Sequence, residues 1–314
     1  MVKIMKKLKT PKLKTEFVAL LASGLVAGAA IAQNEAPLTF SGNLSAGAEY
    51  NSNVSVAELE SASGQSDVAA IVDAGLDADW QVSDQLNING GYSFSSQRYQ
   101  DFDAFDLDMH MLFGDISYDF EAFTLGTSHY FADADLGGNE FLQLNQTSIY
   151  AGKLLSEQWY LRGAFNIVDK SFTGFEARDA DTEGVSLDAF WFFNQGRSSL
   201  TFGYAYDDES TRDPAFAYQA DTVRVRYSNA FSLFGKDSEV ELGLRNQLRD
   251  YKANTPSIGA PRDDSQLFVD ASLKMAVLPR LAVIGKIGRG DFDSRLASAN
   301  YSEERASLSL EYDF

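Results

Sequence analysis

The residues most capable of chemistry are few, because this 314-residue chain contains no cysteine and only two histidines. His129 directly follows Ser128, a pair in which a nucleophile and a general base could be sought. Neighbouring residues of a strand point to opposite faces, however, so these two side chains cannot act together on one side. His110 stands between Met109 and Met111. We therefore expect both histidines to be structural or pore-lining, and we predict that the protein is not an enzyme.

Metal ligation has equally little support in the sequence. Asp133 and Asp135 precede two glycines, as in a calcium loop, but the spacing fails at the third ligand and at the final bidentate glutamate. The acidic runs at 178–183, 207–209 and 262–264 are expected to be solvated loops on the lipopolysaccharide side, bridged loosely by divalent ions. We predict no dedicated metal site and no cofactor.

Most of the chain consists of segments of about 10 to 14 residues in which apolar and polar residues alternate. A period of two is typical of strands with one apolar and one wet face. In segment 265–277 the wet face carries Asp270, Ser272 and Lys274, and the other face carries Leu267, Val269, Ala271, Leu273, Met275 and Val277. A similar apolar row comprises Leu107, Met109, Met111 and Phe113. We expect such rows to face lipid.

About fourteen such segments predict an all-β protein, a transmembrane antiparallel up-and-down β-barrel. They lie near 38–50, 68–82, 86–99, 105–119, 122–134, 140–154, 158–170, 183–194, 198–208, 217–232, 238–252, 265–277, 280–292 and 301–314. Short connections alternate with longer ones, and bacterial barrels place short turns in the periplasm and long loops outside. We therefore expect a location in the bacterial outer membrane with both termini periplasmic.

The first 32 residues are typical of a secretory signal peptide. Six lysines precede an apolar run that ends in Ala30-Ile31-Ala32, so we expect cleavage before Gln33 and a barrel over 33–314. A retained anchor is the alternative, although the run is shorter than the roughly 20 residues that span a membrane. Loss of the six lysines and Glu16 changes the formal net charge from −19 to −24. Such acidity argues against nucleic acid as a partner.

The chain ends in Tyr312-Asp313-Phe314, on a segment that alternates to its last residue. A terminal Phe on such a strand resembles the signature by which outer-membrane barrels are recognised for assembly. We therefore expect Phe314 to be an assembly signal, with the barrel assembly machinery, outer-membrane lipid and lipopolysaccharide as partners.

If the apolar rows face lipid, charged residues line the lumen on two walls. Strands two and four supply the acids Asp73, Asp77, Asp79, Asp106 and Asp108. Strands ten to fourteen supply the bases Arg224, Arg226, Arg245, Lys274, Lys286 and Arg305. We expect these walls to lie across the barrel from each other and to create a transverse field in a pore. The alternative is that the charges pair and plug the lumen, helped by Glu239, Glu241, Asp270 and Glu311.

Several stretches together resemble the barrel domain of the surface lipoprotein assembly modifier family. They are Ala48 to Val54, Leu187 to Phe193 with Gly196-Arg197, Phe202 to Glu209, Leu248 to Tyr251, Arg262 to Asp264 and Ala306 to Phe314. The resemblance implies an outer-membrane barrel that acts on lipoproteins. Relatives carry periplasmic tetratricopeptide repeats, whereas about five residues separate Gln33 from strand one, so the resemblance implies a barrel-only member.

The sequence thus favours a non-enzymatic channel or translocation conduit. One alternative is an accessory barrel that delivers a surface lipoprotein or polymer together with a periplasmic partner such as a repeat protein. The other alternative, an outer-membrane hydrolase, rests only on the precedent of such barrels.

Overall fold

Alternating apolar and polar residues build a closed barrel of fourteen antiparallel strands in the computed structural model, which describes residues 38–314. The expected signal peptide therefore lies outside the described residues. The wall consists of β1 (Leu38–Asn51), β4 (Asp67–Gln81), β5 (Leu86–Tyr99), β6 (Leu107–Asp119), β7 (Thr124–Leu136), β8 (Asn139–Leu154), β9 (Trp159–Phe172), β10 (Ala180–Phe193), β11 (Ser198–Thr211), β12 (Tyr218–Leu233), β13 (Lys236–Tyr251), β14 (Asp263–Leu278), β15 (Leu281–Asp293) and β16 (Tyr301–Asp313). The predicted fold class is confirmed.

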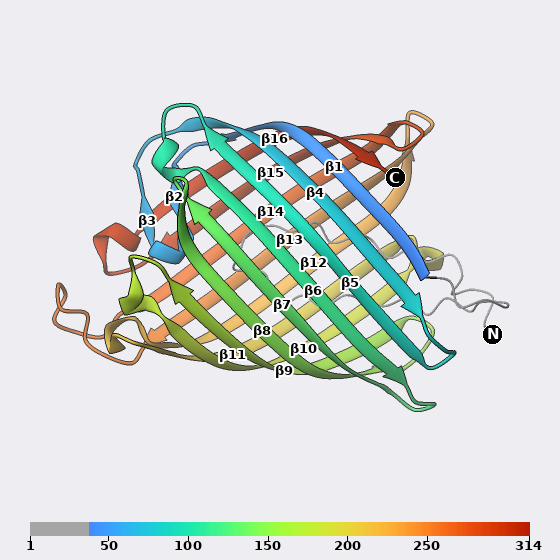
Figure 1. Cartoon of the computed structure of the whole chain (residues 1–314), viewed down its shortest axis with the longest axis horizontal. Coiled ribbons are helices and arrows are strands. Elements are labelled where there is room, and N and C mark those ends of the chain that lie inside the picture. Colours follow the sequence, from blue (N-terminus) through green and yellow to red (C-terminus); the bar gives the residue numbers. More distant parts are fainter. Residues whose placement is uncertain (1–37) are drawn as a thin grey trace.

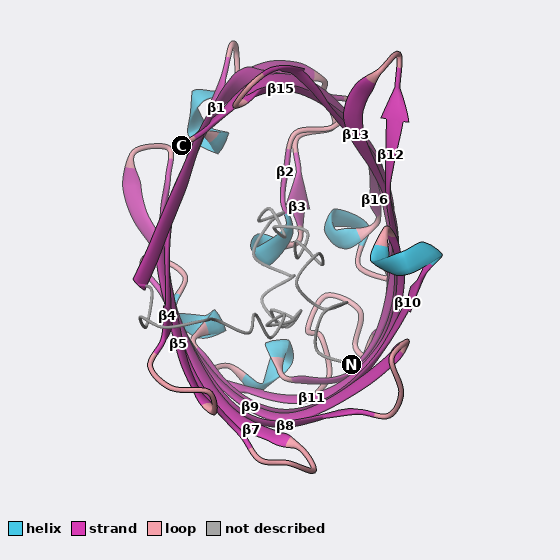
Figure 2. Cartoon of the chain, turned by 90° about the vertical axis from the view of Figure 1, so that its right-hand side faces the viewer, coloured by secondary structure: helices cyan, strands magenta, loops and turns pink. Residues whose placement is uncertain are grey.

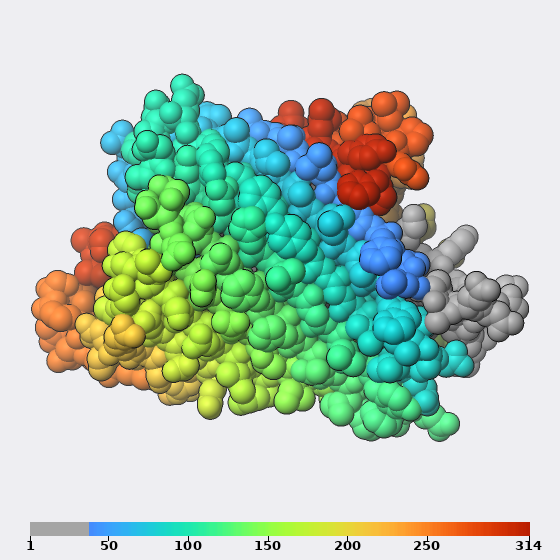
Figure 3. Space-filling model, in the orientation of Figure 1, coloured from blue at the N-terminus to red at the C-terminus, as the bar shows by residue number. Residues whose placement is uncertain are grey.

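The first and last strands close the wall. β1 pairs with β4 on one side and with β16 on the other, from Asn43 opposite Asp313 to Asn51 opposite Arg305. The last residue completes this seam, because Gly42 N donates to Phe314 O (3.0 Å) and Phe314 N donates to Gly42 O (2.9 Å). A closed wall pairs the backbone groups that lipid cannot satisfy. In the space-filling view, side chains of neighbouring strands form a continuous outer surface (Figure 3).

The two rims of the barrel differ in their connections (Figure 1). One rim, which we call the turn rim, carries links of two to four residues at 82–85, 120–123, 155–158, 194–197, 234–235 and 279–280. The described chain also begins and ends at this rim. The opposite loop rim carries 52–66, 100–106, 173–179, 212–217, 252–262 and 294–300, together with the tight turn 137–138. Short 3-10 helices lie in the loop-rim connections, namely η3 (Ala57–Leu59), η4 (Asp103–Phe105), η5 (Glu176–Arg178), η7 (Pro214–Phe216) and η8 (Ala297–Ala299), and one lies in a turn-rim link, η6 (Asn194–Gly196).

The segment 133–140, where the alternation is weakest, is an ordinary hairpin. Gly137 and Gly138 have positive φ angles of 58° and 75°, which suits the two central residues of a tight hairpin turn. The pairing of β7 with β8 also shifts register after Ala134. This irregularity obscures the period of two without breaking the barrel.

Most apolar rows face outward, as expected, with Leu308 63% and Ile287 64% exposed. The row on β6 is an exception. Its side chains face the lumen, and the prediction that they face lipid was wrong. Met109 is only 7% exposed and packs inside the barrel against Phe141 and Leu142. Because β6 carries apolar residues on both faces, alternation alone did not show which face meets lipid. None of the helices in residues 38–314 is long and apolar enough to cross a membrane.

Inside the barrel, near the loop rim, lies a small hairpin (Figure 2). Its strands β2 (Ser55–Val56) and β3 (Ser61–Ala62) belong to the 52–66 connection and flank η3. We call residues 52–66 the luminal hairpin and residues 55–62 its tip.

Which face of β6 meets lipid can be tested with single cysteines, because the chain has none of its own. We expect a bimane on Leu112→Cys to be quenched strongly by brominated lipids, because Leu112 is 53% exposed on the outer wall. A bimane on Met111→Cys, which faces the lumen, should be quenched several-fold less. Stronger quenching at position 111 would show that the Met111 face of β6 meets lipid, as predicted from the sequence.

Candidate functional site

The luminal hairpin is fastened at its stem to the start of β16. Ser52 N donates to Glu304 O (2.9 Å), and Glu304 N donates to the Ser52 hydroxyl (2.7 Å). Within the stem, Val54 N donates to Gln65 O (2.9 Å) and Ser63 N donates to Val54 O (2.8 Å). Val54 itself is fully buried against Ala69, Tyr99, Phe102 and Phe105. The stem therefore directs the tip into the lumen rather than over the rim.

One side of the tip rests on an apolar patch of the inner wall. Val56 and Leu59 pack against side chains of β6 to β9, which we call the inner apolar patch: Leu107, Met109, Ala134, Leu136, Phe141, Leu142 and Phe172. Phe141 and Phe172 meet edge to face, with ring centroids 5.7 Å apart. Burying a Val or Leu side chain contributes about 1.5–3 kcal/mol. Contact with the patch thus stabilises the docked tip, but only by the burial of these two side chains.

The other side of the tip inserts one carboxylate into a cluster of cations. Glu60, 6% exposed, lies 3.2 Å from Arg178 and 3.6 Å from Arg249, measured from carboxylate oxygen to guanidinium nitrogen. Arg262 and the Tyr251 hydroxyl also donate to it. We call Arg178, Arg249, Arg262 and Tyr251 the arginine clamp. The clamp joins β13 to two loops of the loop rim, so the tip bridges β6–β9 and β13 across the lumen.

Neighbouring aromatic rings hold the clamp in place. The guanidinium of Arg262 lies 3.9 Å from the Tyr251 ring centroid, and that of Arg178 lies 4.2 Å from the Phe216 ring centroid. Arg178 also donates to the main-chain carbonyls of Glu58 (3.1 Å) and Leu59 (3.2 Å). The aromatic contacts orient the cations, and the bonds to main-chain carbonyls recognise the backbone of the tip as well as its charge.

The clamp also changes the titration of Glu60. Burial alone raises the pKa of this carboxyl, but the charges of Arg249, Arg178 and Arg262 outweigh burial and lower the pKa from 4.5 to about 2. Glu60 also adopts a left-handed backbone conformation, with φ of 52°. A non-glycine residue is disfavoured there, so some strain opposes the attraction.

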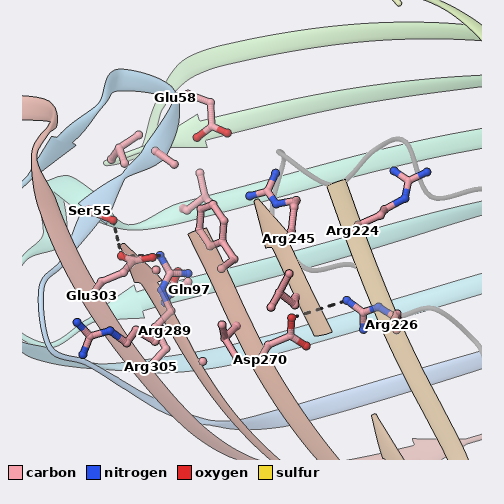
Figure 4. A pocket seen from close by; sticks show the side chains of 18 of the residues that line it. Ser55, Glu58, Gln97, Arg224, Arg226, Arg245, Asp270, Arg289, Glu303 and Arg305 are labelled. Atoms are coloured by element: carbon pink, nitrogen blue, oxygen red, sulfur yellow. Dashed lines mark hydrogen bonds and ion pairs between the residues drawn. The ribbon is translucent and has the colours of Figure 1, made fainter. Parts of the chain in front are cut away.

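Beneath the tip lies a chamber of about 1660 Å³, open solvent included (Figure 4). Its lining combines residues of the inner apolar patch with Arg224, Arg226, Arg245 and Arg305. The tip contributes Ser55 and Glu58, and Ser55 donates to Glu303 at 2.5 Å. The space below the tip therefore has an apolar side and a strongly charged side.

Most of the sequence-predicted luminal residues do project from the inner wall. Asp73, Asp77 and Asp79 alternate with outward Val72, Leu76 and Trp80 on β4. The bases with inward positions are Arg224, Arg226, Arg245, Lys274, Lys286 and Arg305.

Asp106 and Asp108 are not on the inner wall, contrary to the sequence prediction. The two faces of β6 are exchanged relative to the prediction. Asp108 therefore lies on the outer face, where it forms an ion pair with the half-exposed Arg98. Asp106 follows η4 at the loop rim and accepts a hydrogen bond from Tyr99 N (2.7 Å). His110 is also outward and contacts the Tyr92 hydroxyl (2.7 Å). Ser128 and His129 lie on opposite faces, as expected.

The acidic and basic walls are not on opposite sides of the barrel. β16 is separated from β4 only by β1, because the last strand returns to the first. The bases are also paired along the wall: Arg224 with Asp188 (2.6 Å), Arg226 with Glu241 (3.4 Å), Lys274 with Glu311 (2.6 Å) and Arg305 with Glu303 (2.9 Å). Arg245 lies over the Phe268 ring, 4.2 Å from its centroid. The charges thus pair, as one alternative held, but these pairs run along the wall and do not themselves cross the lumen.

Sequence reasoning did not identify Glu60 or the clamp. Arg178 and Arg262 were assigned to solvated acidic loops, and the sequence did not decide whether the connection 51–67 or the luminal charges close the pore. One signal was present: Val54, Val56 and Leu59 are apolar residues at close intervals in a long connection. Such residues indicate that a connection packs against something.

Comparison with known proteins agrees with this fold. The profile of a family described as surface lipoprotein assembly modifier matches residues 41–286. Among solved structures, CdiB from Acinetobacter baumannii is similar, with TM-score 0.51, 11% identity and coverage of 88% of this chain; the chain spans 60% of that protein. OmpT of Vibrio cholerae in its trimer form has TM-score 0.51, 9% identity and coverage of 90% of this chain and 100% of that one. No curated protein matches the sequence.

Replacing Glu60 by Gln should release the tip. Removing one partner of a buried ion pair costs about 3–5 kcal/mol, and about 3 kcal/mol corresponds to roughly 100-fold in the docking equilibrium. A nitroxide on Ser61→Cys, an exposed tip position, should change from slow to fast motion in the electron paramagnetic resonance spectrum of the E60Q protein. Glu58→Gln is the matched control, because its side chain lies outside the clamp, and it should leave the label slow. Equal spectra for E60Q and the parent would refute the role of the clamp.

The same label should report release at low pH. Docking lowers the Glu60 pKa from 4.5 to about 2, so the ionised carboxylate stabilises the docked tip fully above pH 4.5. This contribution is lost as the pH falls from 4.5 toward 2. We expect the spectrum to be constant from pH 7 to 5 and to become mobile below pH 4, while a label on Ser257→Cys in the exposed 252–262 loop stays unchanged. Release that instead begins near pH 6 would require a different titrating group.

Proposed function

We propose that this chain, which belongs to the surface lipoprotein assembly modifier family, is a non-enzymatic conduit of the outer membrane whose lumen is closed by the luminal hairpin. The observation that carries the proposal is the tip itself. A folded segment bridges the lumen between the inner apolar patch and the arginine clamp, with a chamber on its inner side. A barrel that only anchored a surface domain would have no need of such an internal bridge.

The strength of the closure is compatible with opening. The tip is held by two apolar side chains, one carboxylate and a few main-chain hydrogen bonds, with no covalent bond. These terms sum to several kcal/mol, and strain at Glu60 opposes them. A ligand or client that competes for the same contacts can therefore shift the equilibrium.

The orientation follows from the rims. Barrels of bacterial outer membranes carry short turns on the periplasmic side and long loops outside. We therefore assign the turn rim, with both ends of the described barrel, to the periplasm, and the hairpin to the outer mouth. Phe314 at the turn rim, paired through its backbone with Gly42, would be available to the barrel assembly machinery while the wall closes.

A second candidate is an accessory role in which the same conduit delivers a surface lipoprotein or another polymer with a periplasmic partner. The family description favours this candidate. It shares the gated lumen with the first candidate and differs in the cargo, which would be a macromolecule rather than a small solute.

Replacing the tip should open the lumen. Because Val54 and Ser63 are hydrogen-bonded across the stem, residues 55–62 can be replaced by Asn-Gly, which favours a tight hairpin turn. We expect the parent barrel to be mostly silent in a planar bilayer and the variant to carry a steady current at least tenfold larger.

The matched control shortens another loop of the same rim. Thr255 bridges to Ala260, so residues 256–259 can be replaced by Asn-Gly without touching the hairpin. This control should remain silent. A folded tip-replaced barrel that also stays silent would contradict the conduit, and a parent barrel that already conducts fully would contradict closure by the hairpin.

A further inference from the structure

The two surfaces that hold the tip form a continuous site with its own chemistry. The inner apolar patch would be unfavourable in contact with water in an open lumen. The arginine clamp would leave three neighbouring cations without the carboxylate that they share. Undocking of the tip therefore exposes two surfaces that both need an occupant, and the occupant that best stabilises the open state covers both.

We propose that the tip is a built-in substitute for a client peptide, and that the patch and the clamp together bind a polypeptide segment with two apolar side chains followed by a carboxylate. This inference rests on the proposed conduit, because it names the class of client that the conduit admits. The client site is then the same site that the luminal hairpin occupies at rest.

The docked tip shows what the site recognises. The turn of η3 places Val56 and Leu59, three residues apart, on the apolar patch. The left-handed residue that follows, Glu60, turns its carboxylate toward the clamp. A segment of the pattern apolar-x-x-apolar-acidic in a single turn therefore meets both surfaces at once.

Main-chain contacts favour a peptide over other anionic amphiphiles. Arg178 donates to two consecutive carbonyls, those of Glu58 and Leu59, at 3.1 and 3.2 Å. A polypeptide supplies such carbonyls whatever its sequence, so these bonds transfer from the tip to a client. A fatty-acyl chain with an anionic headgroup could cover the patch and the clamp but would lack this pair of acceptors.

The chamber continues the site along the lumen. Glu58 lines it together with Arg245, and Arg224, Arg226 and Arg305 continue the charged side (Figure 4). Arg224, Arg226 and Arg305 are paired with Asp188, Glu241 and Glu303, so this side presents charges of both signs. The preference for an acidic client residue therefore rests on the arginine clamp, and the chamber adds a polar wall beside the apolar patch.

The test uses a fluorescent peptide with the sequence of residues 54–63, VSVAELESAS, and the tip-replaced barrel in bicelles. We expect saturable binding in fluorescence anisotropy, at least tenfold weaker for the peptide with Gln in place of the second Glu. A peptide with Ser in place of the second Val and of the Leu should also bind at least tenfold less tightly. The parent barrel, whose site is occupied, should bind the original peptide at least tenfold less tightly than the variant.

The outcomes separate this inference from the conduit. Binding needs no current, so a variant that conducts but shows no saturable binding, or binds all three peptides alike, overturns the peptide site and leaves the conduit intact. Binding with the expected order in a silent barrel supports the site and contradicts the conduit. If dodecanoyl lysophosphatidic acid blocks the variant's current while the peptide neither blocks nor binds, the site recognises lipid and the peptide proposal is wrong.

Discussion

Closure of the backbone is the constraint on which the rest of the molecule depends. Because lipid offers no hydrogen-bond partners, β1 must meet β16, and fourteen strands fix the circumference of the wall. Barrels of about eight strands can fill their interior with wall side chains, whereas barrels of sixteen or more leave an aqueous channel. A fourteen-stranded wall lies between these cases. Its lumen is too wide to be filled from the wall alone, and the luminal hairpin supplies the missing material at one rim.

The charges of the interior divide into two kinds. On the wall, cations such as Arg224 and Lys274 lie beside carboxylates of nearby strands, so their fields largely cancel within a few ångströms. In the clamp, Arg178, Arg249 and Arg262 converge from three separate positions on one carboxylate of the tip. The first kind makes the wall hydrophilic without closing it. The second kind attracts the tip to the clamp, two parts of the chain that can separate. The proposed gate requires such an attraction.

The sequence alone was sufficient to predict the strands of the barrel wall. Rows such as those of β14 and β16 have one apolar face, and their period of two determines both the strand and its direction. It was insufficient for β6, where Leu112 and Met111 are both apolar, because the direction there depends on a hairpin that packs inside. It was also insufficient for the clamp. Arg262 and Glu60 are 202 residues apart, and no local pattern records a contact over that separation.

In the proposed gate, the stem explains why a tip held by few contacts stays docked. Ser52 and Asn53 are bonded to the start of β16, so an undocked tip stays attached within reach of its site. A short tether gives an effective concentration on the order of millimolar. A free client with the same contacts as the tip would therefore occupy the site only near millimolar concentration. Strain at Glu60 lowers this threshold, since an occupant that makes the same contacts without a left-handed glutamate binds more tightly than the tip does. In the proposed mechanism, the closed state is thus favoured against unrelated peptides, and a client opens it when it fits the site better than the tip or is delivered at the mouth of the barrel.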